Sequence, residues 1–109
     1  MKKNKIGVLL PFKDHFTNSK AGSASIWVKD FNKKSFYKKQ IYVCGSTDNL
    51  KDLIIKNNYL NINFSKRTFK SKNISHVDEF IKIYEKHKFN LIEIHNRPSY
   101  VNYLISKIL

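Results

Sequence analysis

Three polar side chains follow a short apolar run near the end of the chain. The run Leu91–Ile94 is long enough for one strand, and His95, Asn96 and Arg97 come directly after it. Pro98 then ends the strand, because proline lacks an N–H and has a fixed φ. Ligands of open α/β sheets bind outside the carboxyl ends of the strands. We therefore predict that this turn supplies hydrogen-bonding groups to a ligand site, with an ordinary polar turn as the alternative.

A second candidate site lies at the start of a predicted helix. Residues 6–10 are apolar and predict a buried strand that Pro11 closes, and the polar loop 13–21 follows. A helix is expected to begin near Gly22 or Ser23. Free N–H groups and the helix dipole favour an anion at such a place, and a glycine lets a phosphate or sugar approach the backbone. We therefore predict that Gly22 and Ser23 contact a ligand.

Two further segments predict strands. Residues 41–44 form a short apolar run, in which Cys44 is expected to be a small buried hydrophobe without a reactive role. Later in the chain, Leu60, Ile62 and Phe64 alternate with polar residues. This period of two is typical of a strand with one wetter face.

Three amphipathic segments predict helices. Apolar residues at helical spacing define the face that each helix is expected to bury. These positions are Ala24, Trp27, Val28 and Phe31 in the first helix, Val77, Phe80, Ile81 and Tyr84 in the second, and Val101, Leu104, Ile105 and Ile108 in the third. Trp27 is accordingly expected in the core. Ser75 followed by Asp78 fits a capping box, which predicts that the second helix starts there, after a basic loop over 66–73.

The predicted elements run in the order strand, helix, strand, strand, helix, strand, helix. Strands that alternate with amphipathic helices favour right-handed βαβ crossovers and a mostly parallel sheet. We therefore expect an α/β chain with a Rossmann-like, three-layer arrangement. At 109 residues the chain can bury one modest core, and residues 1–109 are expected to form part of one domain.

Several kinds of site are not indicated by the sequence. The three glycines do not form the dinucleotide-binding fingerprint, and there is no P-loop. No His/Cys cluster has metal-ligand spacing, so we expect neither a metal nor a cofactor. His15, His76 and His87 are expected to be exposed polar residues. Neither a Ser-His-Asp triad nor a pair of carboxylates can be argued from spacing alone.

The chain has a formal net charge of +13, from 19 lysines, two arginines and eight acidic residues. A basic chain can bind nucleic acid, an anionic membrane or a phosphorylated substrate. Lysines predominate and are scattered, so sequence-specific nucleic-acid recognition is not indicated. We expect weak peripheral contact with anionic membrane through lysines that include Lys66, Lys70 and Lys72. The single cysteine and the short N-terminal apolar run predict a cytoplasmic location without a signal peptide or membrane span.

Three stretches carry a resemblance to a known family: residues 5–11 (KIGVLLP), 21–28 (AGSASIWV) and 93–100 (EIHNRPSY). Together they resemble the N-terminal, acceptor-side domain of retaining GT-B-fold glycosyltransferases of the family-4 type, particularly bacterial enzymes of lipopolysaccharide and surface-polysaccharide assembly. In that family the loop after the first strand carries two glycines beside the donor diphosphate. Here Gly22 matches one of them, and alanine replaces the other. The family histidine placed near the transferred sugar matches His95.

The resemblance implies an enzyme that transfers a sugar from a nucleotide-sugar donor to a glycan or lipid-linked acceptor. It implies donor or acceptor contacts at Gly22, Ser23 and Arg97. For His95 it implies a position at the catalytic centre, where we expect a hydrogen bond to a sugar hydroxyl or phosphate rather than a general-base role. The family holds its nucleotide mainly in a second Rossmann-like domain, so residues 1–109 alone are expected to be an inactive fragment. Gly22→Val is expected to impair sugar transfer more than folding.

Two other classes remain open. A small basic module that binds RNA or other polyanions would fit the net charge and the 14% aromatic content, although Phe31, Phe80 and Tyr84 stand at core-type positions. Such a module would bind arbitrary nucleic acid in a salt-dependent way. A flavodoxin-like or response-regulator-like domain would need acidic residues at the strand ends or a phosphate-binding Ser/Thr loop. The first strand instead ends in the apolar residues 10–12.

Overall fold

The four predicted strands form one parallel sheet. The computed structural model describes residues 4–63 and 71–108. Within them, the strands are β1 (Ile6–Leu9), β2 (Ile41–Gly45), β3 (Tyr59–Asn61) and β4 (Leu91–Ile94), in the spatial order β3-β2-β1-β4. Each pair of neighbouring strands is parallel, so the predicted α/β fold with a parallel sheet is confirmed. Phe64, which was expected to continue β3, lies outside the described residues.

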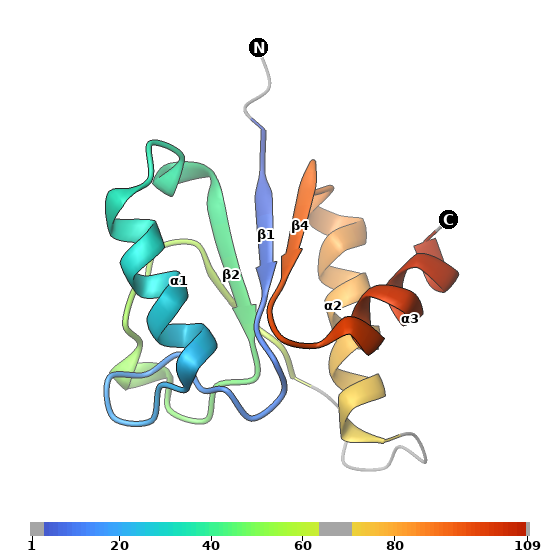
Figure 1. Ribbon diagram of the computed structural model, residues 1–109, viewed down its shortest axis with the longest axis horizontal. Coiled ribbons are helices and arrows are strands. Elements are labelled where there is room, and N and C mark those ends of the chain that lie inside the picture. The colour runs from blue at the N-terminus through green and yellow to red at the C-terminus, as the bar shows by residue number, and fades with distance from the viewer. Residues whose placement is uncertain (1–3, 64–70, 109) are drawn as a thin grey trace.

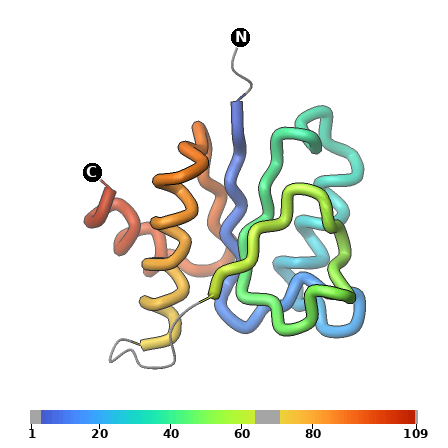
Figure 2. The backbone as a smooth tube through the Cα atoms, turned by 180° about the vertical axis from the view of Figure 1, so that it is seen from behind, coloured from blue at the N-terminus to red at the C-terminus, as the bar shows by residue number. Residues whose placement is uncertain are grey.

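Three helices cover the two faces of this sheet. They are α1 (Ser23–Lys34), α2 (Lys72–His87) and α3 (Pro98–Ile108), with short 3-10 turns over Lys38–Gln40 and Leu50–Asp52. In Figure 1, α1 lies on one side of the sheet, and α2 and α3 lie on the other. The view from behind in Figure 2 shows the same three layers. We call the two sides the α1 face and the α2–α3 face.

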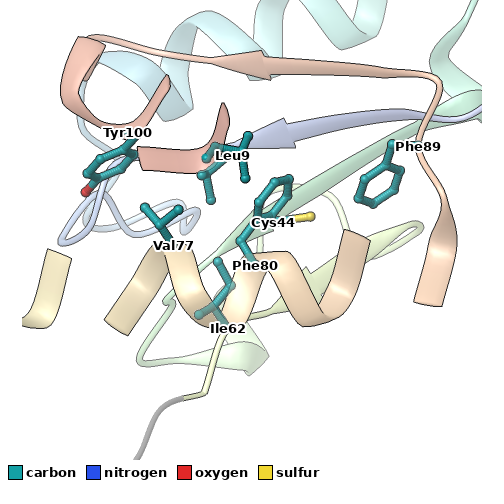
Figure 3. Close-up of a cluster of buried hydrophobic side chains, with 8 residues drawn as sticks. Leu9, Cys44, Ile62, Val77, Phe80, Phe89 and Tyr100 are labelled. Carbon is teal, nitrogen blue, oxygen red and sulfur yellow. The ribbon is translucent and has the colours of Figure 1, made fainter. Parts of the chain in front are cut away.

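A separate apolar core fills each face. On the α1 face its buried members are Val8, Leu10, Phe16, Ala24, Val28, Ile41 and Val43. On the α2–α3 face they are Leu9, Cys44, Ile62, Val77, Phe80, Phe89, Tyr100 and Leu104, most of which are labelled in Figure 3. Successive residues of β1 and β2 alternate between the two cores, as expected for strands that are covered on both sides. Burial raises the pKa of the Cys44 thiol to about 12, which agrees with the inert role predicted for it.

α1 buries only part of the predicted stripe, since Ala24 and Val28 are buried as expected and the two aromatic residues are not. Its buried residues are Ala24, Ser25, Val28 and Asn32. Trp27 and Phe31 stay 48% and 46% exposed, so the expectation of Trp27 in the core is wrong. Their rings stack on each other with centroids 5.0 Å apart and lie toward the edge strand β4. Among the described elements α1 alone covers this face, and no second helix closes over the two rings.

Two predicted apolar segments near the end of the chain are less covered than expected. Among the described strands β4 pairs only with β1, and Leu91 is 58% exposed. In α3, Tyr100 and Leu104 are buried, whereas Val101 and Ile105 are exposed. Because α3 packs against α2 and β4 along one narrow stripe, its other apolar positions face outward.

α2 begins earlier than the capping box predicted. Its N-cap is Ser71, whose Oγ accepts a hydrogen bond of 3.2 Å from the N–H of Ile74. Ser75 is buried inside the helix, and residues 72–73, expected in a loop, form its first turn. A serine hydroxyl caps the helix as expected. The sequence therefore predicts the element and its buried stripe correctly but places its start one turn late.

Candidate functional site

The loops after β1 and β4 meet where the parallel strands end, at the lower edge of the sheet in Figure 1. β1 connects through α1 to β2 on one side, whereas β4 lies on the other side of β1, so the strand order switches between them. Open α/β sheets bind ligands at such a switch point. A depression of about 240 Å³ lies there, which we call the switch-point depression. Its lining residues are Pro11, Phe12, Lys13, Asp14, Gly22, Ser23, Ala24, Asn96 and Arg97.

The depression contains three of the four predicted site residues. Gly22 and Ser23 come from the start of α1, and Arg97 comes from the turn after β4. The fold thus brings together two segments that are far apart in the sequence. His95, the fourth predicted residue, does not line the depression.

Asp14 already occupies the N-terminus of α1. Its Oδ1 accepts hydrogen bonds from the Gly22 N–H (2.8 Å) and the Ser25 hydroxyl (2.6 Å), and its Oδ2 accepts one from the Ser25 N–H (3.2 Å). The carboxylate supplies the negative charge that a helix N-terminus favours. The other N–H groups of the first turn, those of Ser23 and Ala24, have no acceptor within the helix. Both residues line the depression, so these two groups are the ones that α1 can offer to a ligand.

Gly22 makes room for this carboxylate. A Cβ atom at Gly22 would lie 2.8 Å from Oδ1 and 2.9 Å from Cγ of Asp14, which is closer than such atoms approach. The backbone itself would accept a side chain, because φ is −83°. The missing side chain therefore serves the cap of α1. We therefore expect Gly22→Val to disturb folding as well as ligand contact, and the prediction that sugar transfer suffers more than folding stays a prediction.

The turn after β4 presents Asn96 and Arg97 to the depression. Asn96 has a φ of 54°, in the left-handed region that asparagine tolerates better than most residues. Nη1 of Arg97 donates a hydrogen bond of 2.7 Å to the backbone oxygen of Asn96. This bond uses one of the five donors of the guanidinium group. Lys13, across the depression, also has a positive φ of 75°.

His95 lies beside α1, next to the depression rather than in it. Its side chain is 16% exposed, and its ring packs against Trp27 with centroids 5.0 Å apart. Nε2 is buried and makes no hydrogen bond, although Oε2 of Glu93 stands 3.5 Å away at ion-pair distance. A distance of 3.5 Å is long for a hydrogen bond, so Glu93 does not satisfy this nitrogen. The imidazole of His95 therefore has one buried ring nitrogen, Nε2, that makes no hydrogen bond.

A buried histidine supports the end of β1 from the opposite face. His76 is 0% exposed, and its two ring nitrogens each lie 2.7 Å from an oxygen, Nε2 from the Leu10 carbonyl and Nδ1 from the Ser46 hydroxyl. A carbonyl oxygen only accepts, so Nε2 carries the proton, and Nδ1 of the neutral ring accepts from Ser46. Burial lowers the pKa of His76, and the bond to Leu10 partly opposes this shift. The predicted exposure of His76 is wrong, and His15 and His87 are partly buried as well.

Tyr100 fixes the backbone beside the depression. Its hydroxyl accepts a hydrogen bond of 3.1 Å from the N–H of Phe12 and donates one to Oδ1 of Asn73. Phe12 lines the depression, so α2 and α3 hold one of its walls in place. This support connects both helices of the α2–α3 face to the loop after β1.

Two residues that support this region are not predicted as such by the patterns above, although the sequence carries a signal for each. Asp14 is the first acidic residue of a chain rich in lysine, and Asp30 is the next. His76 stands four residues before Phe80, so helical periodicity already places it on the buried stripe of α2. Pairing Asp14 with Gly22 requires the loop geometry, which no local pattern gives.

The structure offers no metal site among the residues that it describes, since no three His, Cys, Asp or Glu side chains gather there. None of the helices over 4–63 and 71–108 is long and apolar enough to cross a membrane. Lys66 and Lys70, expected at a membrane surface, lie outside the described residues, and Lys72 is exposed at the start of α2. Membrane contact therefore stays a prediction. No protein-family model, no curated protein and no solved structure matches this chain.

Proposed function

We propose that this chain is the acceptor-side, N-terminal part of a retaining GT-B-type glycosyltransferase, and that the switch-point depression contacts its nucleotide-sugar donor. The observation that carries the proposal is the meeting of the loops after β1 and β4 at the switch point of a parallel sheet. The residues that meet there include Gly22, Ser23 and Arg97, which the sequence resemblance assigns to donor or acceptor contacts.

The size of the depression limits what it can hold. Its volume is about 240 Å³, whereas sites for drug-sized ligands span roughly 300–1,000 Å³. The depression has room for one phosphate group or one sugar ring, and not for a whole nucleotide sugar. A second wall would have to bind the nucleotide, which agrees with the two-domain arrangement that the resemblance implies.

The charges divide the depression into two parts. Lys13 and Arg97 are cationic and favour a phosphate near the turn after β4. The Asp14 carboxylate disfavours a second anion at Gly22. We therefore assign phosphate contact to Arg97 and Asn96, and a sugar hydroxyl to the N-terminal turn of α1 at Ser23.

His95 is assigned a supporting contact in the same site. Nε2 of His95 makes no hydrogen bond, and its ring packs against Trp27. His95 directly precedes Asn96, which lines the depression. A small ring rotation would let Nε2 bond a sugar hydroxyl, which would remove the cost of a buried polar atom without a partner. In this proposal the chain positions the donor and acceptor, and such positioning contributes to catalysis only when the remaining reacting groups are also held in place.

The test is a titration of the isotope-labelled 109-residue chain with UDP-, GDP- and ADP-glucose, followed by amide NMR. We expect one of them to shift the N–H signals of Ser23, Ala24, Asn96 and Arg97, with no sugar transferred or hydrolysed. Arg97→Gln should weaken that binding about tenfold, which is the order expected for a charged hydrogen bond. Lys107→Gln, the same charge change at the far end of α3, should leave it unchanged. Turnover by the purified chain, or shifts confined to other surfaces, would contradict the proposal.

A further inference from the structure

The opposite edge of the sheet carries a larger pocket with a uniform charge. It lies where the strands begin, at the upper edge of Figure 1, and its volume is about 720 Å³. We call it the amino-edge pocket. Its lining residues are Asn4, Lys5, Lys39, Gln40, Tyr42, His87, Lys88 and Asn90. Three are lysines and none is acidic, so the pocket has a positive potential that its own walls do not neutralise.

The lysine head groups have no carboxylate partners in the part of the chain that the structure describes. Nζ of Lys5 lies 5.6 Å from the centre of the Tyr42 ring, and Nζ of Lys88 lies 6.0 Å from the centre of the Tyr84 ring. Ammonium groups on ring faces keep their charge and most of their hydrogen-bond donors. An anion entering the pocket would therefore not have to break a salt bridge first.

Backbone hydrogen bonds hold the pocket walls in place. The Lys5 N–H donates to Oδ1 of Asn90, and the Asn90 N–H donates back to the Lys5 carbonyl, both at 2.8 Å. The carbonyl of Lys39 accepts from Nδ2 of Asn58 at 2.9 Å, and the N–H of Lys88 bonds the last turn of α2 at 2.7 Å. These bonds fix where the lysine side chains start, so the cost of ordering them around a ligand is limited to the side chains.

The pocket also offers aromatic and amide groups. The rings of Tyr42 and His87 lie 5.6 Å apart and are tilted by 44°, and the Phe89 ring lies 5.8 Å from His87 and 5.9 Å from Tyr42. Asn4 and Gln40 add side-chain amides that can donate or accept. Lysines beside aromatic rings and amides suit a ligand that joins phosphate groups to a planar ring.

We propose that the amino-edge pocket binds a small phosphorylated molecule of the nucleotide class, with Lys5, Lys39 and Lys88 on the phosphates and the Tyr42–His87 wall on the ring. A volume of about 720 Å³ lies within the roughly 300–1,000 Å³ of small-molecule sites. The partial negative charge at the C-terminus of α2 opposes this binding, and the positive charges of Lys86 and Lys88 at that end offset it. This inference is independent of the proposed function, since the two sites lie at opposite edges of the sheet.

His87 provides a readout inside the pocket. Burial, and then the nearby charges of Lys5 and Lys86, lower the pKa of its imidazole. A phosphate bound beside these lysines would reverse the effect of their charges. The pKa of His87 should therefore rise when the pocket is filled, which can be followed in the NMR signals of its ring protons.

The experiment titrates the 109-residue chain with ADP, pyrophosphate, adenosine and a short single-stranded RNA at low salt. We expect ADP to bind more tightly than pyrophosphate or adenosine, to shift the amide signals of His87, Lys88 and Asn90, and to raise the pKa of His87. A triple variant with Lys5, Lys39 and Lys88 changed to Gln should weaken ADP binding about tenfold or more. The matched control changes Lys29, Lys51 and Lys107 to Gln, which alters the net charge equally outside the pocket and should leave ADP binding unchanged.

Three results would overturn the inference. Equal weakening by both triple variants would mean that ADP responds only to the net charge. Tighter binding of RNA than ADP, reduced equally by both variants, would mean a general polyanion surface instead. ADP shifts confined to Ser23, Asn96 and Arg97 would place the nucleotide at the switch-point depression, which would support the proposed function while rejecting this pocket. Shifts at Asn90 without any at Arg97 would support this pocket, and the titration with nucleotide sugars would still decide the proposed function separately.

Discussion

His76 joins three parts of the chain through one imidazole ring. The ring belongs to α2. It donates a hydrogen bond to the carbonyl of Leu10, at the end of β1, and accepts one from the hydroxyl of Ser46, after β2. The bond to Leu10 needs a proton on Nε2, and in the neutral ring Nδ1 accepts from Ser46. A charged ring would place a charge in a buried site, so the fold favours the neutral form.

We predict that this histidine makes the fold less stable in mild acid. The pKa of His76 is lowered in the folded chain from the ordinary value of 6.5. Above that value neither state binds the proton, and the histidine contributes nothing to the pH dependence. Below it the unfolded chain binds the proton and the folded chain does not, so the free energy of unfolding falls by at most about 1.4 kcal/mol per pH unit. Urea unfolding at about pH 7.5 and about pH 5.5 measures the difference.

His76→Gln is the matched variant, because its amide can donate to Leu10 and accept from Ser46 without titrating. The pKa of His87 is lowered too, so both proteins keep its contribution and only the difference between them reports on His76. The wild type should lose more stability than the variant over this range. Parallel losses, or ring-proton NMR signals that show a charged His76 in the folded chain at about pH 6, would disprove the prediction. The NMR measurement stands even if the variant does not fold.

At the scale of elements, α1 depends on a residue outside the helix. Asp14 lies in the loop after β1, and its three hydrogen bonds join this loop to the first turn of α1. The close approach at Gly22 is part of the same arrangement. The cap therefore positions both the helix and one wall of the switch-point depression.

We predict that Asp14 and Gly22 are energetically coupled. Asp14→Ala should reduce the free energy of unfolding by about 1–2 kcal/mol, as the loss of a helix cap does. Gly22→Ala should destabilise the wild type because its Cβ displaces the carboxylate. The same substitution should cost at least about 0.5 kcal/mol less when Asp14 is already alanine. Urea unfolding of the four proteins gives the coupling directly.

The general preference against alanine at an N-cap affects Gly22→Ala equally with and without Asp14, so the double-mutant cycle removes it. Asp14→Asn provides a further control, because the amide keeps one acceptor oxygen and the side-chain size. It should retain part of the stability that Asp14→Ala loses. Additive effects of Asp14→Ala and Gly22→Ala would mean that the glycine is not there to admit the carboxylate.

The sequence predicts which elements form better than which way they face. Periodicity identifies α1 and two of its buried residues, Ala24 and Val28. The helix is rotated, however, so that Ser25 and Asn32 are buried in place of Trp27 and Phe31. Tertiary packing decides this rotation, because the small residues allow α1 to lie close to β1 and β2 while the large rings lie toward the edge strand β4. The predicted start of α2 is wrong for a local reason, since serines at 71 and 75 offer the same capping chemistry one turn apart. The capping role of Asp14 could not be predicted, because the geometry of a loop and not a periodic pattern brings it to Gly22 and Ser25.

At the scale of the molecule, net charge and apolar surface oppose each other. The chain carries a net charge of +13, which repels copies of itself. Its α1 face has a groove of about 440 Å³ beside β4. The groove is lined by Ile6, Phe31, Ser35, Tyr37, Ile41, Leu91, Ile92 and Glu93. Within the described residues β4 has no neighbour beyond β1, so its outer backbone groups can pair with another strand.

We predict that the chain associates with itself through β4 when salt screens its charge. At low ionic strength the repulsion between positive chains should keep it monomeric. At about 0.5 M salt the Debye length is well under 10 Å, so the exposed edge and the groove beside it should bring copies together. Sedimentation should show an average mass that rises with both salt and protein concentration.

Leu91→Lys places a charge on the edge and should suppress this rise, because lysines on edge strands are a common protection against pairing. Leu50→Lys is the control, since Leu50 is 50% exposed, close to the 58% of Leu91, but lies in the turn Leu50–Asp52 away from β4. Equal suppression by the two variants would attribute the association to general charge or apolar surface, and would remove the edge of β4 as its cause.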